Sequence, residues 1–183
     1  MFDFINYYEK LMEIDSKQIF DVCLLSKNMS DKPYIATNGD NSYNKDYVIS
    51  ENFTRVKAEH VGGTIILFPN DIAFTWISHQ TKLKDILNDI IIYLNKFDNN
   101  IVLKDNDVML GDKKLFGTMS SGVGPYYEGM FFSFNSDIEI IKKVSTKPMV
   151  KEPIGLSAIG ITSEDIQNLI MNLIQKYNLK LYE

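Results

Sequence analysis

The amino-acid sequence predicts an α+β fold with a mixed, largely antiparallel central sheet and flanking helices. Six short apolar runs bounded by turn residues gather in the middle of the chain, and segments with helical spacing of apolar residues precede, interrupt and follow them. This grouping favours a sheet covered by helices over a regular alternation of strands and helices. Because 183 residues is the length of one ordinary domain, we expect residues 1–183 to form a single domain.

Three segments have the apolar spacing of amphipathic helices. The first covers residues 2–12 and the second covers residues 85–97. In the third, Thr162 and Asp165 have the spacing of a capping box, and one apolar face follows them. That face consists of Ile166, Leu169, Ile170, Leu173, Ile174 and Tyr177. Turn-forming residues dominate residues 28–46, which we therefore expect to be a loop.

The predicted strands cover residues 64–68, 73–77, 101–103, 108–110, 114–118 and 130–135. Gly111 and Asp112 separate two of these strands by the two-residue spacing of a tight hairpin. The first position of such a turn favours glycine because it requires a positive φ angle. Lys114 is therefore expected just past the turn, on the second strand of the hairpin.

Composition and charge exclude several classes of protein. The net charge is −5 and the lysines are scattered, so a nucleic-acid partner is not expected. No apolar run approaches the roughly 20 residues of a membrane helix, and the N-terminus lacks the pattern of a secretory signal, so we expect a cytoplasmic protein without a membrane partner. The only cysteine, Cys23, excludes internal disulfides and is expected to pack as a small apolar residue.

The most informative segment is KDNDVMLGDKKLFG at residues 104–117. In this segment Asn106 and Asp107 open a predicted strand, and Lys114 and Gly117 follow the predicted hairpin. The arrangement resembles the signature of the biotin and lipoate protein ligases, in which an Asn-Asp pair opens a strand and a lysine after a hairpin precedes an apolar residue and a glycine. The resemblance implies that the chain is one catalytic domain of that family.

Three further segments are similar, in the same order, to the catalytic domain of lipoate ligases. The run VGGTIILF at residues 61–68 resembles the glycine-rich loop and its strand, and DIAFTW at residues 71–76 resembles the next strand. GLS at residues 155–157, followed by GIT at residues 160–162, resembles the end of the domain. The resemblance covers about residues 55–177 and is nearer to lipoate ligases than to biotin ligases.

The resemblance implies a two-step activity. Enzymes of this family use ATP and Mg²⁺ to convert a carboxylic acid into an acyl-adenylate, and the amine of a lysine on a carrier protein then displaces AMP. Both steps build negative charge, which a preorganised ammonium group stabilises where it develops. Lys114 matches the lysine that has this role. Taken by itself, the segment is equally compatible with a solvated lysine beside a hairpin.

The resemblance also implies binding residues around Lys114. Asp107 matches an acidic residue implicated in metal and nucleotide contacts, and carboxylate oxygens suit Mg²⁺. The alternative for Asp107 and Asn106 is that they satisfy backbone groups in the turn. Gly62 and Gly63 could bring backbone N–H groups against a ligand, or could form a turn alone. The remaining expected binding residues are Thr64, Gly117 and Thr118.

One departure from the family pattern concerns phosphate recognition. Lipoate ligases usually carry paired arginines just before the glycine-rich loop, where this chain has KAEH at residues 57–60, and Arg55 is the only arginine. Lys57 can supply a point charge but not the planar fork of arginine. His60 is a candidate pocket residue. His79 is expected to be structural, because two histidines are too few for a histidine metal site.

The function favoured by the sequence is an ATP-dependent ligase that attaches lipoate to a lysine of a lipoyl carrier domain. Biotin or another small acid is the alternative substrate, because KKLFG at residues 113–117 looks more like a biotin ligase. A non-catalytic relative that binds a ligand or protein is a second class, which the missing arginines would explain. A third is an unrelated α+β domain. An acyltransferase would need a cysteine at the acyl site, and Cys23 lies far upstream.

Overall fold

The computed structural model describes residues 1–37, 43–58, 64–120 and 126–182. The strands of its larger sheet are β1 (Phe2–Asp3), β2 (Val22–Lys27), β6 (Ile72–Ser78), β7 (Ile101–Lys104), β8 (Asp107–Leu110), β9 (Lys113–Ser120), β10 (Tyr126–Phe132) and β11 (Lys180–Leu181). Those of its smaller sheet are β3 (Tyr34–Thr37), β4 (Thr54–Lys57) and β5 (Ile65–Leu67). The helices are η1 (Phe4–Asn6), α1 (Tyr7–Ser16), α2 (Lys45–Ser50), α3 (Leu83–Leu94), α4 (Ile138–Val144), η2 (Leu156–Ile159) and α5 (Ser163–Lys176), of which η1 and η2 are 3₁₀ turns.

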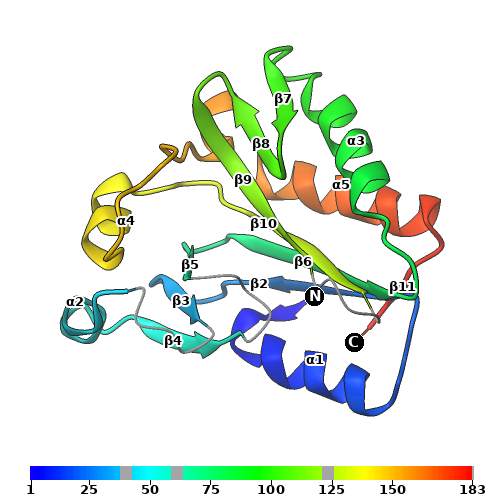
Figure 1. Cartoon of the computed structure of the whole chain (residues 1–183), viewed down its shortest axis with the longest axis horizontal. Coiled ribbons are helices and arrows are strands. Elements are labelled where there is room, and N and C mark those ends of the chain that lie inside the picture. The colour runs from blue at the N-terminus through cyan, green and yellow to red at the C-terminus, as the bar shows by residue number, and fades with distance from the viewer. Residues whose placement is uncertain (38–42, 59–63, 121–125, 183) are drawn as a thin grey trace.

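The larger sheet has the order β1-β2-β6-β10-β9-β8-β7, and β11 also pairs with β2. From β2 to β7 every neighbouring pair is antiparallel, whereas β1 and β11 run parallel to β2. Figure 1 shows α3 and α5 on one face of this sheet, and α1 with the smaller sheet on the other face. The predicted α+β fold, with a mixed, largely antiparallel sheet and flanking helices, is confirmed.

Alternating side chains of the central strands build two cores, one on each face of the larger sheet. In β2, Cys23 and Leu25 pack toward α3 and α5, whereas Val22 and Leu24 pack toward α1 and the smaller sheet. Successive side chains of a strand point to opposite faces, so a strand covered on both sides reads as a continuous apolar run. Cys23 therefore packs as a small apolar residue, as expected, and its burial raises the pKa of its thiol to about 12.

The second and third predicted helices are present with the expected buried faces. In α3 the buried residues are Ile86, Leu87, Ile90 and Leu94, although the helix begins at Leu83 and ends before Phe97. In α5 the predicted capping box is present: the hydroxyl of Thr162 accepts from the backbone N–H of Asp165, whose carboxylate accepts from the backbone N–H of Thr162. Each of these bonds satisfies a donor that a helix N-terminus leaves without an intrahelical partner.

The first predicted helix was placed too early. Phe2 and Asp3 form β1 by pairing with Ser26 and Lys27, and the α-helix occupies Tyr7–Ser16 instead of residues 2–12. The prediction of a loop over residues 28–46 was also wrong in part, because β3 lies within it and α2 begins there. The strands β1 and β3 exist through pairing with distant segments, which local sequence patterns do not encode. Residues 38–42 of that stretch lie outside the described residues.

A buried carboxylate joins β6, β10 and the start of α3. Glu128 on β10 is 2% exposed and accepts hydrogen bonds from the indole N–H of Trp76, at 2.8 Å, and from the backbone N–H of Lys82, at 2.8 Å. The hydroxyl of Thr81 also donates to it. These three donors offset the cost of burying the charge and fix the connection from the sheet to α3. No helix among the described residues is long and apolar enough to cross a membrane.

Candidate functional site

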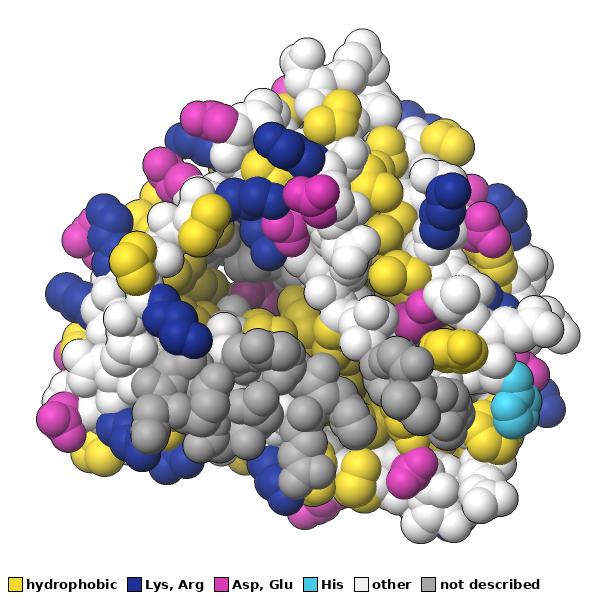
Figure 2. All heavy atoms as spheres, in the orientation of Figure 1, with side chains coloured by type: hydrophobic (Ala, Val, Ile, Leu, Met, Phe, Trp, Pro, Cys, Tyr) yellow, Lys and Arg dark blue, Asp and Glu magenta, His cyan; other side chains and the backbone are white. Residues whose placement is uncertain are grey.

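A cavity of about 610 Å³ lies between the two sheets. It is lined by β5, β9, β10, α4 and the segment of residues 145–153 that connects α4 to η2. Figure 2 shows the hollow on this face of the molecule, with apolar side chains inside it and charged side chains gathered on its upper rim. The apolar lining residues are Ile65, Ile66, Phe68, Leu115, Phe116, Met119, Phe131, Ile141, Val144, Met149 and Pro153. The cavity can therefore accommodate an elongated apolar group whose polar end reaches the rim.

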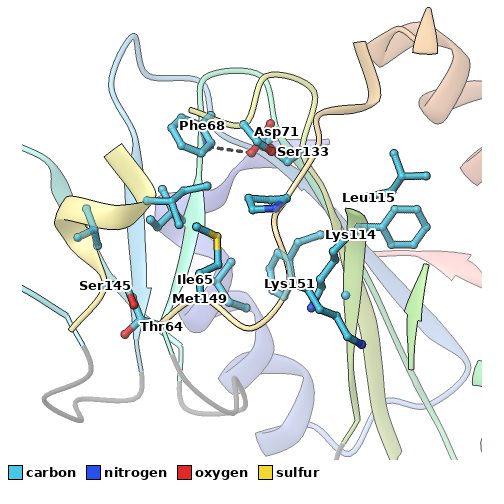
Figure 3. Close-up of a pocket in the computed structure, with 18 of the residues that line it drawn as sticks. Thr64, Ile65, Phe68, Asp71, Lys114, Leu115, Ser133, Ser145, Met149 and Lys151 are labelled. Carbon is cyan, nitrogen blue, oxygen red and sulfur yellow. Dashed lines mark hydrogen bonds between the residues drawn. The ribbon is translucent and has the colours of Figure 1, made fainter. Parts of the chain in front are cut away.

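A chain of two ion pairs stands beside this cavity. The Nζ atom of Lys114 lies 2.7 Å from Oδ1 of Asp107, and the Nζ atom of Lys151 lies 2.7 Å from Oδ2 of the same carboxylate. Both lysines line the cavity and lie side by side in Figure 3. Their side chains are 35% and 26% exposed, and that of Asp107 is 21% exposed. Two ammonium groups around one carboxylate leave a net positive charge at the cavity wall, which favours an anionic ligand.

The local structure of the β8–β9 hairpin explains how Lys114 reaches this position. Gly111 has a φ angle of +63° in the two-residue turn between Leu110 and Lys113, as the sequence predicted. Beyond the turn, Met109 pairs with Lys114 but Val108 pairs with Phe116, so Leu115 is an extra residue in β9. This β-bulge changes the direction of the strand next to Lys114. The hairpin and its bulge together place Lys114 in the cavity wall, with its ammonium group at Asp107.

Gly117 provides the space for the Lys114–Asp107 ion pair. It lies opposite Asp107 across the hairpin, and a Cβ atom added to it would lie 2.6 Å from Nζ of Lys114 and 3.2 Å from Oδ1 of Asp107. Real Cβ atoms do not approach other atoms as closely as 2.6 Å. A residue without a Cβ atom is therefore needed at position 117 if the Lys114 side chain is to reach the Asp107 carboxylate.

The two lysines change the ionisation of their shared partner. Partial burial acts to raise the pKa of Asp107, but the hydrogen bonds from Lys114 and Lys151 outweigh it and hold the pKa below its ordinary value. The same hydrogen bond to Asp107 raises the pKa of Lys151, against a smaller opposing effect of desolvation. Near neutral pH both Asp107 and Lys151 are therefore charged.

Lys151 is a residue that the sequence did not reveal. It lies in the segment after α4, where the backbone N–H of Lys114 donates to Glu152 and the backbone N–H of Ile154 donates to Lys114, at 2.8 and 2.9 Å. This short parallel pairing places Lys151 against Asp107, which is 44 positions earlier in the chain. No spacing rule for a helix, strand or turn links positions so far apart, so no sequence signal could have identified it.

The other predicted binding residues are placed unevenly. Thr64, Gly117 and Thr118 line the cavity with Lys114. Asn106 is exposed in the β7–β8 turn, where its backbone carbonyl accepts a hydrogen bond from the hydroxyl of Thr118. Asn106 is not among the described residues that line the cavity, and its binding role stays a prediction.

The remaining predicted site residues do not line the cavity wall that the structure describes, or they lie outside the described residues. The side chain of Lys57 is exposed at the end of β4, where its ammonium donates to the hydroxyl of Tyr8 at 3.2 Å and lies over the Tyr8 ring. Lys57 is not among the described residues that line the cavity. His60, Gly62 and Gly63 lie outside the described residues, and His79 packs against the ring of Phe20.

The opposite end of the cavity contains a second carboxylate. Asp71 is 2% exposed and accepts from the backbone N–H groups of Phe68 and Phe134, at 2.8 and 2.9 Å. Burial raises the pKa of Asp71 to about 7, although these hydrogen bonds act to lower it. Figure 3 shows Asp71, Phe68 and Ser133 together, away from Lys114 and Lys151. Asp71 thus ties the turn before β6 to the residues that follow β10.

The described residues do not offer Mg²⁺ a site at Asp107. Magnesium requires oxygen ligands at about 2.0–2.1 Å in octahedral geometry, whereas both oxygens of Asp107 already accept hydrogen bonds from ammonium groups. A magnesium ion bound to either oxygen would compete with the ammonium group already there, which carries charge of the same sign. Within the described ranges, no group of three or more His, Cys, Asp or Glu side chains could hold a metal ion.

Comparison with known proteins finds similarity in structure alone. No family model and no curated protein sequence matches the chain. Among solved structures, a bipartite lipoate protein ligase of Thermoplasma acidophilum, from a study of an archaeal lipoylation system with its E2 lipoyl domain, has a TM-score of 0.76 at 10% identity. The match covers 100% of this chain and 85% of that one.

Two further solved structures of similar fold contain a bound ligand. A lipoate-protein ligase A bound with ATP has a TM-score of 0.73 at 12% identity, over 98% of this chain and 81% of that one. LipL1 of P. falciparum in complex with lipoate has a TM-score of 0.70 at 18% identity, over 85% of this chain. The chain spans about half of the length of LipL1, since 49% of that protein is covered. The larger sheet, the smaller sheet and their helices thus form the fold of the lipoate-protein ligases.

Proposed function

We propose that this chain is an ATP-dependent ligase that activates lipoate as an acyl-adenylate and transfers the acyl group to a lysine of a lipoyl carrier domain. In this proposal residues 1–183 act as one catalytic domain. The single observation that carries it is the position of Lys114, whose ammonium lines an apolar cavity in a lipoate-ligase fold. The neighbour bound to ATP and the neighbour bound to lipoate support the same pair of substrates.

In the first step of the proposed reaction, each part of the cavity would have its own task. The apolar lining between Ile65, Met119 and Phe131 would take up the hydrocarbon part of the acid and exclude water from it. The carboxylate would then lie at the lysines. A carboxylate oxygen attacks the α-phosphorus of ATP, the bond to the β-phosphate oxygen breaks, and pyrophosphate leaves. Lys114 stabilises the charge that develops on the transferring phosphoryl group and on the carboxylate.

The second step uses the same ammonium group. The neutral amine of the carrier lysine attacks the carbonyl carbon of the acyl-adenylate, the bond to the phosphate oxygen breaks, and AMP leaves as the amide forms and the amine loses a proton. The oxygen of the attacked carbonyl becomes negative in the transition state. Lys114, already aimed at the carboxyl end of the acid, can stabilise that oxygen without reorganisation.

A direct test separates adenylate formation from transfer. The protein is incubated with ATP, Mg²⁺ and either lipoate or biotin, and pyrophosphate release is measured; carrier domains are then added and weighed by mass spectrometry. Lipoate-dependent pyrophosphate release and a lipoylated carrier are expected. Lys114→Met should reduce pyrophosphate release by about 10²–10³-fold, as loss of one such electrostatic group typically does.

The control variant is Lys113→Met, because Lys113 is the adjacent lysine of the same strand and pairs with Glu152 at 3.3 Å instead of with Asp107. Its pyrophosphate release should match that of the wild type. Full activity of Lys114→Met, or no adenylate with either acid, would overturn the proposed function.

A non-catalytic binding protein is the second candidate, and one specific observation favours it. Arg55 is the only arginine, and its exposed side chain lies over the ring of Tyr43 instead of lining the cavity. The described wall thus holds no guanidinium fork for a triphosphate. Lipoate binding without pyrophosphate release at any ATP concentration would select this candidate.

A further inference from the structure

The charged cluster beside the cavity consists of one carboxylate, Asp107, held between two ammonium groups. Each of its oxygens accepts one hydrogen bond at 2.7 Å, from Lys114 on one side and from Lys151 on the other. A carboxylate with both oxygens so engaged has a fixed rotamer. Turning either oxygen toward a cation would weaken one of the two ion pairs and would place a third positive charge beside the two ammonium groups.

The backbone reinforces this arrangement from both lysines. The strand that carries Lys114 is paired with the segment that carries Lys151, through hydrogen bonds from Lys114 to Glu152 and from Ile154 to Lys114. Asp107 faces Gly117 in the register of the same hairpin. The three charged side chains therefore stem from three neighbouring backbone segments, and none depends on a ligand for its place.

We propose that Asp107 and Lys151 are positioning residues for Lys114, and that Asp107 is not a magnesium ligand. Lys151 binds Oδ2 of Asp107 and thereby fixes the rotamer of this carboxylate. Oδ1 of the same carboxylate then holds the Lys114 ammonium at the cavity wall. The arrangement fixes the flexible lysine before substrate arrives, so less conformational entropy is lost in the transition state. This inference rests on the proposed function for its kinetic consequences, but not for its statement about metal.

The kinetic test measures pyrophosphate release as a function of acid, ATP and Mg²⁺ concentration. Asp107→Asn and Lys151→Met should each lower kcat by about 10–100-fold, the usual effect of removing a partner that orients a reactive group. The Mg²⁺ concentration for half-maximal rate should stay that of the wild type. Lys151→Arg, which keeps a cationic donor, should recover most of the lost rate. A purely structural role would not give this rescue of kcat by a second cationic side chain.

The matched control is Lys104→Met. The backbone of Lys104 is paired with that of Asp107 across the β7–β8 hairpin. The side chain of Lys104 is exposed and forms no ion pair with any described residue. The Lys104→Met substitution therefore removes one positive charge close to Asp107 without changing the charged cluster, and the rate of this variant should equal that of the wild type. If Asp107→Asn instead raised the required Mg²⁺ concentration about tenfold with little change in the saturated rate, Asp107 would be a metal ligand and the inference would be overturned.

A second arm does not depend on turnover. Mn²⁺ is titrated into the free wild-type protein and into Asp107→Asn and Lys151→Met, and binding is followed by the loss of its paramagnetic resonance signal. The wild type and Asp107→Asn should give the same curve. Mn²⁺ binding by the wild type that Asp107→Asn abolishes would overturn the inference. If neither lipoate nor biotin supports pyrophosphate release, the proposed function has failed, and this titration still decides whether Asp107 binds metal.

Discussion

Lys114 occupies the space that a side chain at Gly117 would need: its Nζ atom lies 2.6 Å from the position of a Cβ atom on that residue. The absence of a side chain at Gly117 therefore leaves the space that the Lys114 ammonium occupies. Because the nearest atoms belong to the flexible end of the lysine and to the carboxylate of Asp107, an added methyl group can be accommodated by moving them aside.

Gly117→Ala should displace the Lys114 ammonium from Asp107 and leave the fold intact. We expect adenylate formation to fall by about 10–100-fold, as for other changes that misplace a reactive group, with a melting temperature close to that of the wild type. Gly111→Ala is the matched control. It lies in the same hairpin at a φ angle of +63° with no atom within 4 Å, so it should lower stability by about 1–2 kcal/mol and keep activity. The reverse pattern would contradict the packing argument.

The pH dependence of stability should reveal the ion pairs of Asp107. Burial acts to raise its pKa, but the two lysines outweigh burial and hold the pKa below the ordinary value of 3.8. A lowered pKa in the folded state adds stability above the unfolded-state pKa, and this stability is lost as pH falls through the folded value. The stability difference between wild type and Asp107→Asn should thus be constant from neutral pH to about 3.8 and shrink below it. Urea unfolding of both proteins measures it, and a difference independent of pH would refute the ion pairs.

Glu128→Ala should be among the most destabilising substitutions outside the cavity. It leaves the buried indole N–H of Trp76 and the backbone N–H of Lys82 without their acceptor, at a cost of about 2–4 kcal/mol. Glu139→Ala is the control, since Glu139 is exposed and forms an ion pair with Lys142 in the same helix, where about 0.5 kcal/mol is expected. Equal midpoints of chemical unfolding for the two variants would count against the role given to Glu128.

The two glycines around η2 should respond differently to alanine. At Gly155 a Cβ atom would lie 2.2 Å from the backbone carbonyl oxygen of Phe134, which cannot move alone because the same oxygen accepts from Ser157. At Gly160, with φ +77°, no atom lies within 4 Å. Gly160→Ala should cost about 1–2 kcal/mol through strain alone, and Gly155→Ala should cost more, because backbone must shift. Thermal unfolding compares them, and a milder effect at Gly155 would disprove the close packing.

Nucleotide binding by the free protein should be weaker than acid binding. Lys57, the nearest replacement for the usual arginines, is exposed and engaged with Tyr8, whereas the apolar cavity and Lys114 remain available to the acid. Lipoate, or an unreactive acyl-adenylate mimic, should raise the melting temperature more than ATP does at the same concentration, because stabilisation follows concentration relative to Kd. Lys57→Ala should reduce the ATP effect and leave the lipoate effect unchanged. A strong ATP effect that survives Lys57→Ala would show that the phosphates bind elsewhere.

The sequence by itself determined the features that depend on neighbours along the chain. Thr162 and Asp165 fix the start of α5 because the capping box closes within one turn, and Gly111 fixes the β8–β9 hairpin because a two-residue turn needs its φ angle. The hairpin in turn fixes the position of Lys114 on β9. Apolar periodicity likewise placed α3 and most strands of the larger sheet.

Only the tertiary structure decided which distant segments meet. Phe2 and Asp3 become a strand because β2 offers them a free edge, and residues 34–37 become a strand because β4 and β5 lie on either side. In the candidate site, the sequence placed Asp107 and Lys114 on the two strands of one predicted hairpin, but Lys151 joined them only through the pairing of its segment with β9. Such contacts form because folding buries apolar surface over the whole chain, and the resulting neighbours carry no local signal.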